Sequence, residues 1–243
     1  MMGNFDTLIF EKVDSIAYIT LNRPEVLNAY NMRMRDELYQ VLMAISDDPE
    51  VRVAVLKGAG DKAFCAGADL TEFLTAPSPT VARQVRWERD VWGLFLRCPC
   101  PLIAALHGYV LGSGIEMALC CDIRIASEDV QFGLPEVTLG IIPAAGATQT
   151  LPRVVGRAKA LEMMFLGGRV GASEALDIGL VNGVVSRSKL YSTASDMARR
   201  ISQFDPRVVA GIKQAVTRGL DLSLVEGLAI EKILAGAIID LKR

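Results

Sequence analysis

The chain has 243 residues, of which 51% are hydrophobic and 22% charged, as in ordinary globular proteins with a sizeable core. Its net charge of -2 and its pI near 5.6 provide no basic footprint, so we expect neither nucleic acid nor an anionic membrane as a partner. No apolar run approaches the roughly 18 to 20 residues that span a bilayer, and the start of the sequence lacks a signal-peptide pattern, so we expect a cytoplasmic protein.

The hydrophobic pattern up to residue 187 predicts strands that alternate with helices, which indicates the α/β fold class. Short apolar runs predict strands at residues 8–11, 16–21, 51–57, 102–106, 123–126, 130–132 and 181–185. Helical spacing predicts helices at residues 31–46, 80–97, 113–121, 158–166 and 172–178.

The pattern changes near residue 187, after which no strand is predicted. Residues 189–203, 206–218 and 223–240 all have helical spacing. We therefore divide the chain into a core at 1–187 and a helical C-terminal region at 188–243. The last helix carries a wide apolar face that includes Leu224, Leu228 and Ile233, and we expect it to pack on the core or on another subunit.

The five cysteines give no sign of a metal site. Cys98 and Cys100 are separated by one residue and Cys120 and Cys121 are adjacent, whereas zinc sites use paired CxxC spacings or several histidines. We expect the cysteines to be reduced and buried, and we expect no metal.

Two glutamates lie in apolar, glycine-punctuated segments. Glu116 follows the Gly112-Ser113-Gly114-Ile115 turn, and Glu136 ends the sequence Phe132-Gly133-Leu134-Pro135-Glu136. A carboxylate embedded in apolar sequence must find a partner or carry a raised pKa. Two such groups that converge on one pocket can move protons at neutral pH.

Two glycine-rich turns provide backbone N–H groups that a ligand can approach. Ala66-Gly67-Ala68-Asp69 follows a strand, and Gly112-Ser113-Gly114 opens a helix, whose first N–H groups favour negative charge. Two such donors aimed at one point form an oxyanion hole. Each turn by itself is also common in proteins without a catalytic role.

The order and spacing of these segments are similar to those of the crotonase family, the enoyl-CoA hydratase/isomerase superfamily. The matching stretches are LNRP at 21–24 with NA at 28–29, AFCAGADL at 63–70, HGYVLGSGIE at 107–116, CDIR at 121–124, QFGLPE at 131–136 and LGIIP at 139–143. The resemblance covers nearly the whole chain. It implies a spiral core of stacked β-β-α turns and a helical tail that assembles the protein as a homotrimer or a dimer of trimers.

The resemblance also implies an acyl-CoA thioester substrate. The backbone N–H groups of Ala68 and Ser113 would hold the thioester oxygen. Further contacts to CoA or substrate are implied for Val26, Leu27, Ala29, Ala66, Gly67, Asp69, Leu70, Tyr109, Gly112, Pro135, Leu139 and Gly140. Coenzyme A is part of the substrate, and no separate cofactor or metal is expected.

Because both glutamate positions of the hydratase subgroup are filled, the resemblance implies syn addition of water to an enoyl-CoA. Glu116 would activate the water for attack at Cβ, and Glu136 would deliver a proton at Cα. Family members that only isomerise the double bond typically need one glutamate. Isomerisation, another enolate-stabilising reaction and a non-catalytic binding role remain as alternatives.

The sequence departs from the family pattern at three places. Ser113 stands where glycine is common, and Ala144-Ala145-Gly146-Ala147 stands where Gly-Ala-Gly-Gly is more usual. The helices past Asp240 that often complete the acyl pocket and the trimer contacts are expected to be abbreviated here to Leu241-Lys242-Arg243. These differences bear on the shape of the acyl pocket and on assembly.

Other polar and aromatic residues receive weaker predictions. We expect His107 to be structural, and Asp69 to cap a helix or contact CoA rather than act as an acid. Arg23 and Lys62 are candidates for contact with the CoA phosphates, or simply solvated charges. Trp87 and Trp92 lie in a predicted helix, where packing is the favoured role over lining the acyl pocket.

Overall fold

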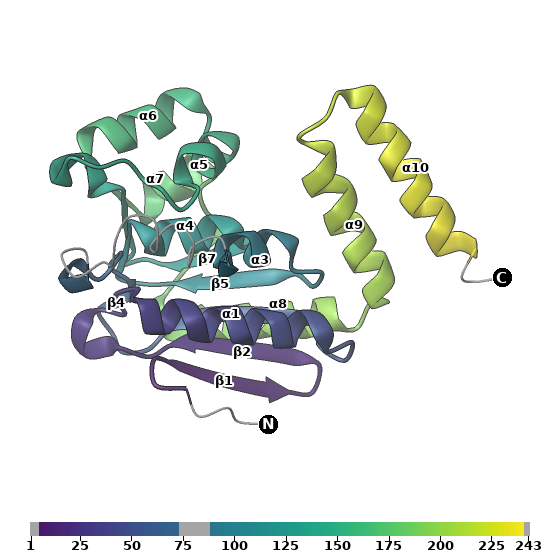
Figure 1. Cartoon of the computed structure of the whole chain (residues 1–243), viewed down its shortest axis with the longest axis horizontal. Coiled ribbons are helices and arrows are strands. Elements are labelled where there is room, and N and C mark those ends of the chain that lie inside the picture. Colours follow the sequence, from purple (N-terminus) through teal and green to yellow (C-terminus); the bar gives the residue numbers. More distant parts are fainter. Residues whose placement is uncertain (1–4, 73–87, 241–243) are drawn as a thin grey trace.

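The computed structural model describes residues 5–72 and 88–240, which form two β-sheets covered by helices (Figure 1). The larger sheet has the strand order β1-β2-β3-β5-β7-β10 within this part of the chain. Its strands are β1 (Leu8–Val13), β2 (Ile16–Leu21), β3 (Val53–Gly58), β5 (Leu102–Leu106), β7 (Ile123–Ser127) and β10 (Gly183–Val185). Strands β1 and β2 form an antiparallel hairpin, and all the other pairs are parallel.

The smaller sheet has the order β4-β6-β8-β9. Its three-residue strands are β4 (Ala63–Cys65), β6 (Tyr109–Leu111), β8 (Gln131–Gly133) and β9 (Arg169–Gly171). The chain visits the two sheets in turn, as β3 then β4, β5 then β6, and β7 then β8. Each circuit therefore adds one parallel strand to each sheet, which is a spiral of repeating turns.

Helices cover both faces of the larger sheet at its central strands, so β3 and β5 are buried along almost their whole length, whereas the edge strand β1 is partly exposed. Along β3, Ala54 and Leu56 pack into the main core, whereas Val53 and Val55 face α8 (Leu190–Ser202). This alternation follows the two-residue period of a strand. Strand β5 divides in the same way, and helical cover on both sides explains why its whole sequence is apolar.

Helix α1 (Met32–Asp47) shows how the local sequence forms its element. The side chain of Asn31 accepts a hydrogen bond from the Met34 N–H (2.8 Å) and caps the first turn. Residues spaced three and four apart form its buried face: Met34, Leu38, Val41, Leu42 and Ile45. The helix was predicted at 31–46, and the prediction is confirmed to within one residue.

The remaining described helices surround this core. They are α3 (Val91–Arg97), α4 (Ser113–Cys120), α5 (Ala147–Val155), α6 (Arg157–Leu166), α7 (Ala172–Asp177), α9 (Pro206–Gly219) and α10 (Leu224–Asp240). Short 3₁₀ turns occur at Pro24–Val26, Leu70–Glu72, Pro135–Leu139 and Arg187–Lys189.

The helices after residue 187 have two different environments. Helix α8 packs directly on the larger sheet through Leu190, Ala194 and Ala198. Helices α9 and α10 form a hairpin that stands to one side of the sheets in Figure 1. Gly219 and Gly227 lie against each other and let these two helices approach closely.

Several elements differ from the sequence predictions. The short strands β4, β6 and β9 and helix α5 were not predicted. A helix was predicted at 80–97, of which residues 80–87 lie outside the described residues. Over the described part, the prediction of one continuous helix is wrong. Asp90 is not helical, and its side chain accepts the Gly93 N–H (2.9 Å), so α3 begins anew at Val91.

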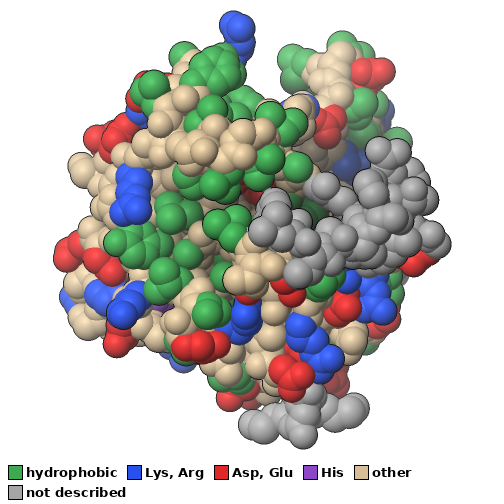
Figure 2. Space-filling view, turned by 60° about the vertical axis from the view of Figure 1, so that its left-hand side comes forward, with side chains coloured by type: hydrophobic (Ala, Val, Ile, Leu, Met, Phe, Trp, Pro, Cys, Tyr) green, Lys and Arg blue, Asp and Glu red, His purple; other side chains and the backbone are tan. Residues whose placement is uncertain are grey.

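Within the described part of the chain, no helix has the length and hydrophobicity needed to cross a membrane. On the face shown in Figure 2, Lys and Arg side chains are interspersed with Asp and Glu rather than gathered into a continuous basic area.

Candidate active site

The two glycine-rich turns meet because Gly114 has no side chain. A Cβ at Gly114 would lie 2.2 Å from the Cys65 carbonyl oxygen and 3.0 Å from the Cys65 Cβ. Only glycine therefore lets the first turn of α4 rest on the end of β4. Gly67, with φ of +109°, and Gly112, with φ of +48°, lie against each other where the turns touch. The contact brings Ala68 and Ser113 to the same place.

The N–H groups of Ala68 and Ser113 are available to a ligand. Gly67 O accepts the Tyr30 N–H and Asp69 N–H donates to Tyr30 O (2.8 Å each), so the N–H of the intervening Ala68 faces the other way. Ser113 is the first residue of α4, where the N–H has no intrahelical acceptor. Neither N–H has a hydrogen-bond partner among the described residues. Both N–H groups are thus free to donate to a ligand, and their role as an oxyanion hole stays a prediction.

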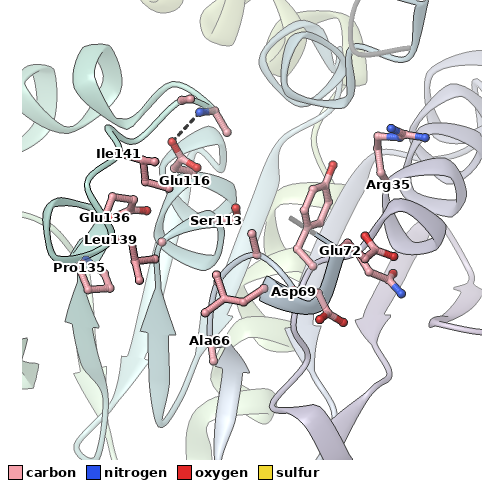
Figure 3. Close-up of a pocket in the computed structure, with 18 of the residues that line it drawn as sticks. Arg35, Ala66, Asp69, Glu72, Ser113, Glu116, Pro135, Glu136, Leu139 and Ile141 are labelled. Carbon is pink, nitrogen blue, oxygen red and sulfur yellow. Dashed lines mark hydrogen bonds between the residues drawn. The ribbon is translucent and has the colours of Figure 1, made fainter. Parts of the chain in front are cut away.

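Glu116 is buried and accepts two backbone hydrogen bonds. Its side chain is only 3% exposed, and its Oε1 accepts the N–H of Ala145 (2.8 Å) and of Ala147 (3.2 Å) (Figure 3). Two backbone donors on one oxygen favour the negative charge. Ala145 matches the usual family pattern, and Ala147 provides the same N–H group that a glycine would, so the departure at position 147 leaves this contact intact.

Glu136 has a contrasting environment. It lies in the 3₁₀ turn Pro135–Leu139, and its Oε2 is buried without a hydrogen-bond partner in the described part of the chain. Burial, and secondarily the charge of Glu116, raise the pKa of Glu136 above its ordinary value. Its Oε1 lies 2.9 Å from where a Cβ at Gly112 would stand, so glycine there makes room for the carboxyl beside the Ser113 turn.

These groups line one cavity of about 1000 Å³. Figure 3 shows Glu116 and Glu136 on the same side of it, with Ser113 close by. The predicted site residues in its wall are Ala66, Gly67, Ala68, Asp69, Leu70, Gly112, Ser113, Glu116, Pro135, Glu136, Leu139 and Gly140.

Residues 11–242 match the sequence model of the enoyl-CoA hydratase/isomerase family. The chain belongs to this family. The short-chain-enoyl-CoA hydratase of Clostridium acetobutylicum is 41% identical over 226 residues, which are 93% of this chain and 87% of that protein. The (E)-benzylidenesuccinyl-CoA hydratase of Thauera aromatica is 38% identical over 232 residues, 95% of this chain and 90% of its own.

The structure of the enoyl-CoA hydratase from Bacillus anthracis has a TM-score of 0.92 to this chain at 37% identity. The match covers 97% of this chain and 92% of the other. The α/β spiral fold with a helical C-terminal region, which the sequence resemblance implied, is thereby confirmed.

Four residues with implied CoA or substrate contacts do not line the cavity. Val26 ends the 3₁₀ turn Pro24–Val26, and Leu27 and Ala29 follow it. Leu27 O accepts the Ala66 N–H (3.0 Å), so this segment supports the Ala66–Ala68 turn. The ring of Tyr109 lies under the guanidinium of Arg169, 4.8 Å from it. For these four family positions, contact with CoA stays a prediction.

Asp69 forms an ion pair in this family member. Its Oδ2 accepts from Arg23 Nη1 (2.9 Å), and its Oδ1 accepts from the Thr71 hydroxyl (2.6 Å). The Thr71 hydrogen bond, with Arg23 in a lesser role, holds the pKa of Asp69 below its ordinary value. A carboxyl that is ionised so readily is not a proton donor. Arg23 is therefore engaged by Asp69 and by Ala29 O (2.7 Å) rather than solvated.

His107 is buried and lies away from the cavity. Its Nδ1 is 3.4 Å from the Tyr191 hydroxyl, and burial lowers its pKa to about 4. A neutral, enclosed imidazole beside α8 fits the structural role that was predicted. Trp92 both packs and lines the cavity, with its ring 5.5 Å from that of Tyr30. Trp87 lies outside the described residues.

The sequence reasoning missed one end of the cavity. Its wall there includes residues from the start of α1 and from both sides of residues 73–87: Tyr30, Asn31, Met32, Arg35, Glu72 and Arg89. None of these six residues lies in a sequence stretch that resembles the family. Among the described residues, no group of three or more His, Cys, Asp or Glu side chains is placed to hold a metal ion.

Proposed function

We propose that this member of the family is an enoyl-CoA hydratase, which adds water reversibly and from one face across the α,β double bond of an enoyl-CoA thioester. The observation that carries the proposal is the opposite environment of two carboxyls in one cavity. Glu116 accepts two backbone N–H bonds and is stabilised as the anion, whereas burial favours the neutral form of Glu136. Hydration needs a base for the water, an acid for Cα and donors for the thioester oxygen. Glu116, Glu136 and the N–H groups of Ala68 and Ser113 can fill these roles.

In the proposed reaction, one water binds between the two carboxyls. Glu116 takes a proton from this water as its oxygen attacks Cβ, and the π electrons of the double bond move toward the thioester oxygen. The N–H groups of Ala68 and Ser113 stabilise the resulting enolate-like charge. Glu136 then donates its proton to Cα. Proton transfer through the next bound water restores the two carboxyls.

The protein would need no separate cofactor for this reaction. Water addition transfers protons and no electrons, and coenzyme A arrives as part of the substrate. The carboxyls and the backbone donors supply the acid, the base and the electrostatic stabilisation.

The test is incubation with crotonyl-CoA while the conjugated enoyl absorbance is followed. We expect this absorbance to fall to an equilibrium level and 3-hydroxybutyryl-CoA to form. A protein that instead converts a β,γ-enoyl-CoA to the conjugated isomer, with no hydrated product, would be an isomerase. Isomerisation requires only one of the two carboxyls, so the pairing of Glu116 with Glu136 favours hydration.

We further propose that the α9–α10 hairpin joins subunits into a trimer or a dimer of trimers. Leu220, Leu224 and Val225 are 75%, 77% and 78% exposed on this hairpin, and Leu228 and Ile233 extend the apolar surface. Apolar side chains gathered in this way on a monomer indicate a protein contact.

Sedimentation at micromolar concentration is expected to give the mass of three or six chains. Leu228→Arg should shift the distribution toward smaller species, because it places a charge on the proposed contact. Val13→Arg is the matched control, since Val13 is exposed to nearly the same extent (54% against 53%) but lies on β1. A monomeric wild-type protein contradicts the proposed assembly.

A further inference from the structure

Two arginines line the cavity wall away from the glutamates. Arg35 is on α1, and Arg89 precedes α3. Figure 3 shows Arg35 on the α1 side of the cavity, opposite Glu116 and Glu136. Neither arginine has a part in the proposed addition of water.

The two guanidiniums share a single carboxylate. Asp36 Oδ1 accepts from Arg35 Nε (2.9 Å), and it lies 2.8 Å from Arg35 Nη2 and 3.2 Å from Arg89 Nη1. Among the described residues, Asp36 is the only ion-pair partner of either arginine. One carboxylate neutralises one guanidinium, so this group of three retains a positive charge. The side chain of Arg35 is only 19% exposed, which weakens the screening of that charge by water.

The other acidic side chains in this part of the wall are already engaged. Glu72 Oε2 accepts the Met32 N–H (2.8 Å) at the beginning of α1, where the helix dipole favours a negative charge. Asp69 is paired with Arg23. Neither carboxylate forms an ion pair with Arg35 or Arg89 in the described structure.

A hydrocarbon chain would gain little from such a wall. It would displace water from the guanidiniums and offer them no hydrogen-bond acceptor, which carries a desolvation cost. A carboxylate offers two acceptor oxygens that match the planar donor fork of arginine. The adjacent Tyr30, Leu70 and Trp92 provide apolar wall for the methylene groups between the two ends of such a chain.

We propose that the preferred acyl chain carries a second carboxylate at its far end, which Arg35 and Arg89 bind while Glu116 and Glu136 act on the enoyl group. The substrate class is thus an enoyl-CoA derived from a dicarboxylic acid. This inference rests on the proposed hydratase function for its chemical step, whereas binding of the anionic chain can be measured without turnover.

The experiment compares saturated acyl-CoA thioesters of equal chain length by calorimetric titration. Glutaryl-CoA is paired with pentanoyl-CoA, and adipoyl-CoA with hexanoyl-CoA, so that each pair differs only in the terminal carboxylate. We expect the wild-type protein to bind at least one dicarboxylyl thioester about tenfold more tightly than its partner. The identical CoA moiety cancels in each ratio.

Substitutions of the two arginines test whether they cause the preference for the dicarboxylyl thioester. Arg35→Met and Arg89→Met should each remove most of the ratio, and Arg35→Lys should retain part of it because the charge remains without the planar fork. Arg199→Met is the matched control, since Arg199 is an ion-paired arginine on α8. Its ratio should equal that of the wild-type protein.

The outcomes separate this inference from the proposed function. Equal affinities within both pairs overturn the anion site, even if crotonyl-CoA is hydrated. A preference for the dicarboxylyl chain that survives both methionine substitutions overturns the assignment to Arg35 and Arg89. Intact preference without hydration of any enoyl thioester, including glutaconyl-CoA, leaves the anion site standing and overturns the hydratase proposal.

Discussion

Glu116→Gln and Glu136→Gln are each expected to lower kcat for hydration by about 10²- to 10⁴-fold, because each removes one proton-transfer group. Glutamine keeps the size of the side chain. At position 116 its carbonyl can still accept the Ala145 and Ala147 N–H bonds, so the local fold should survive. Stopped-flow or steady-state absorbance with crotonyl-CoA measures the loss.

Binding and a surface control separate chemistry from folding. Both variants should bind a saturated acyl-CoA with nearly wild-type affinity, since neither carboxyl is assigned to CoA. Glu162→Gln replaces a half-exposed glutamate on α6 and should leave kcat unchanged. Near-full hydratase activity in either site variant would mean that the two-carboxyl mechanism is wrong. Surviving isomerisation in Glu116→Gln alone would favour the isomerase alternative.

The pH dependence follows from the raised pKa of Glu136. The hydration step needs this carboxyl protonated, so kcat/KM should fall as pH rises through its pKa, which burial places above the ordinary glutamate value. An amide has no proton to lose in this range. The alkaline fall assigned to Glu136 should therefore be absent from the residual activity of Glu136→Gln, and its persistence there would assign it to another group.

The long, periodic elements could be predicted from the sequence because each contains enough residues to define a period. Helix α1 repeats its apolar spacing from Met34 to Ile45, about three turns, and β5 is a fully apolar run that matches its predicted bounds. Strands β4, β6 and β9 have three residues each, too few to establish an alternation. Helix α5 contains Pro152, which obscured its helical pattern.

The candidate site also has a part that could be predicted from the sequence and a part that could not. Ala68, Ser113, Glu116 and Glu136 were predicted because family-specific stretches mark them, and the apolar surroundings of the glutamates gave an independent reason; the structure places all four in the wall of one cavity. The pairing of Arg35 and Arg89 through Asp36 could not be found, because it depends on α1 lying beside the segment before α3. Single charged residues on a helix carry no sequence signal for such a contact.

Ser113→Pro is expected to lower kcat by about 10²- to 10³-fold, the usual cost of losing one oxyanion-hole donor. Proline has no N–H, yet it is well tolerated at the first position of a helix, which Ser113 occupies in α4. The loss should appear in kcat more than in KM, because the N–H binds the developing oxyanion better than the ground-state carbonyl. Circular dichroism and acyl-CoA binding check that α4 and the cavity remain formed.

Ser113→Gly and Ser113→Ala are the matched controls, because both keep the N–H and lose only the hydroxyl. The Ser113 hydroxyl has no hydrogen-bond partner among the described residues, so both variants should retain most of the activity. A loss in Ser113→Ala as severe as that in Ser113→Pro would place the hydroxyl itself in the chemistry and require a more specialised reaction than hydration. Full activity in a folded Ser113→Pro would remove this N–H from the oxyanion hole and leave Ala68 as its remaining assigned donor.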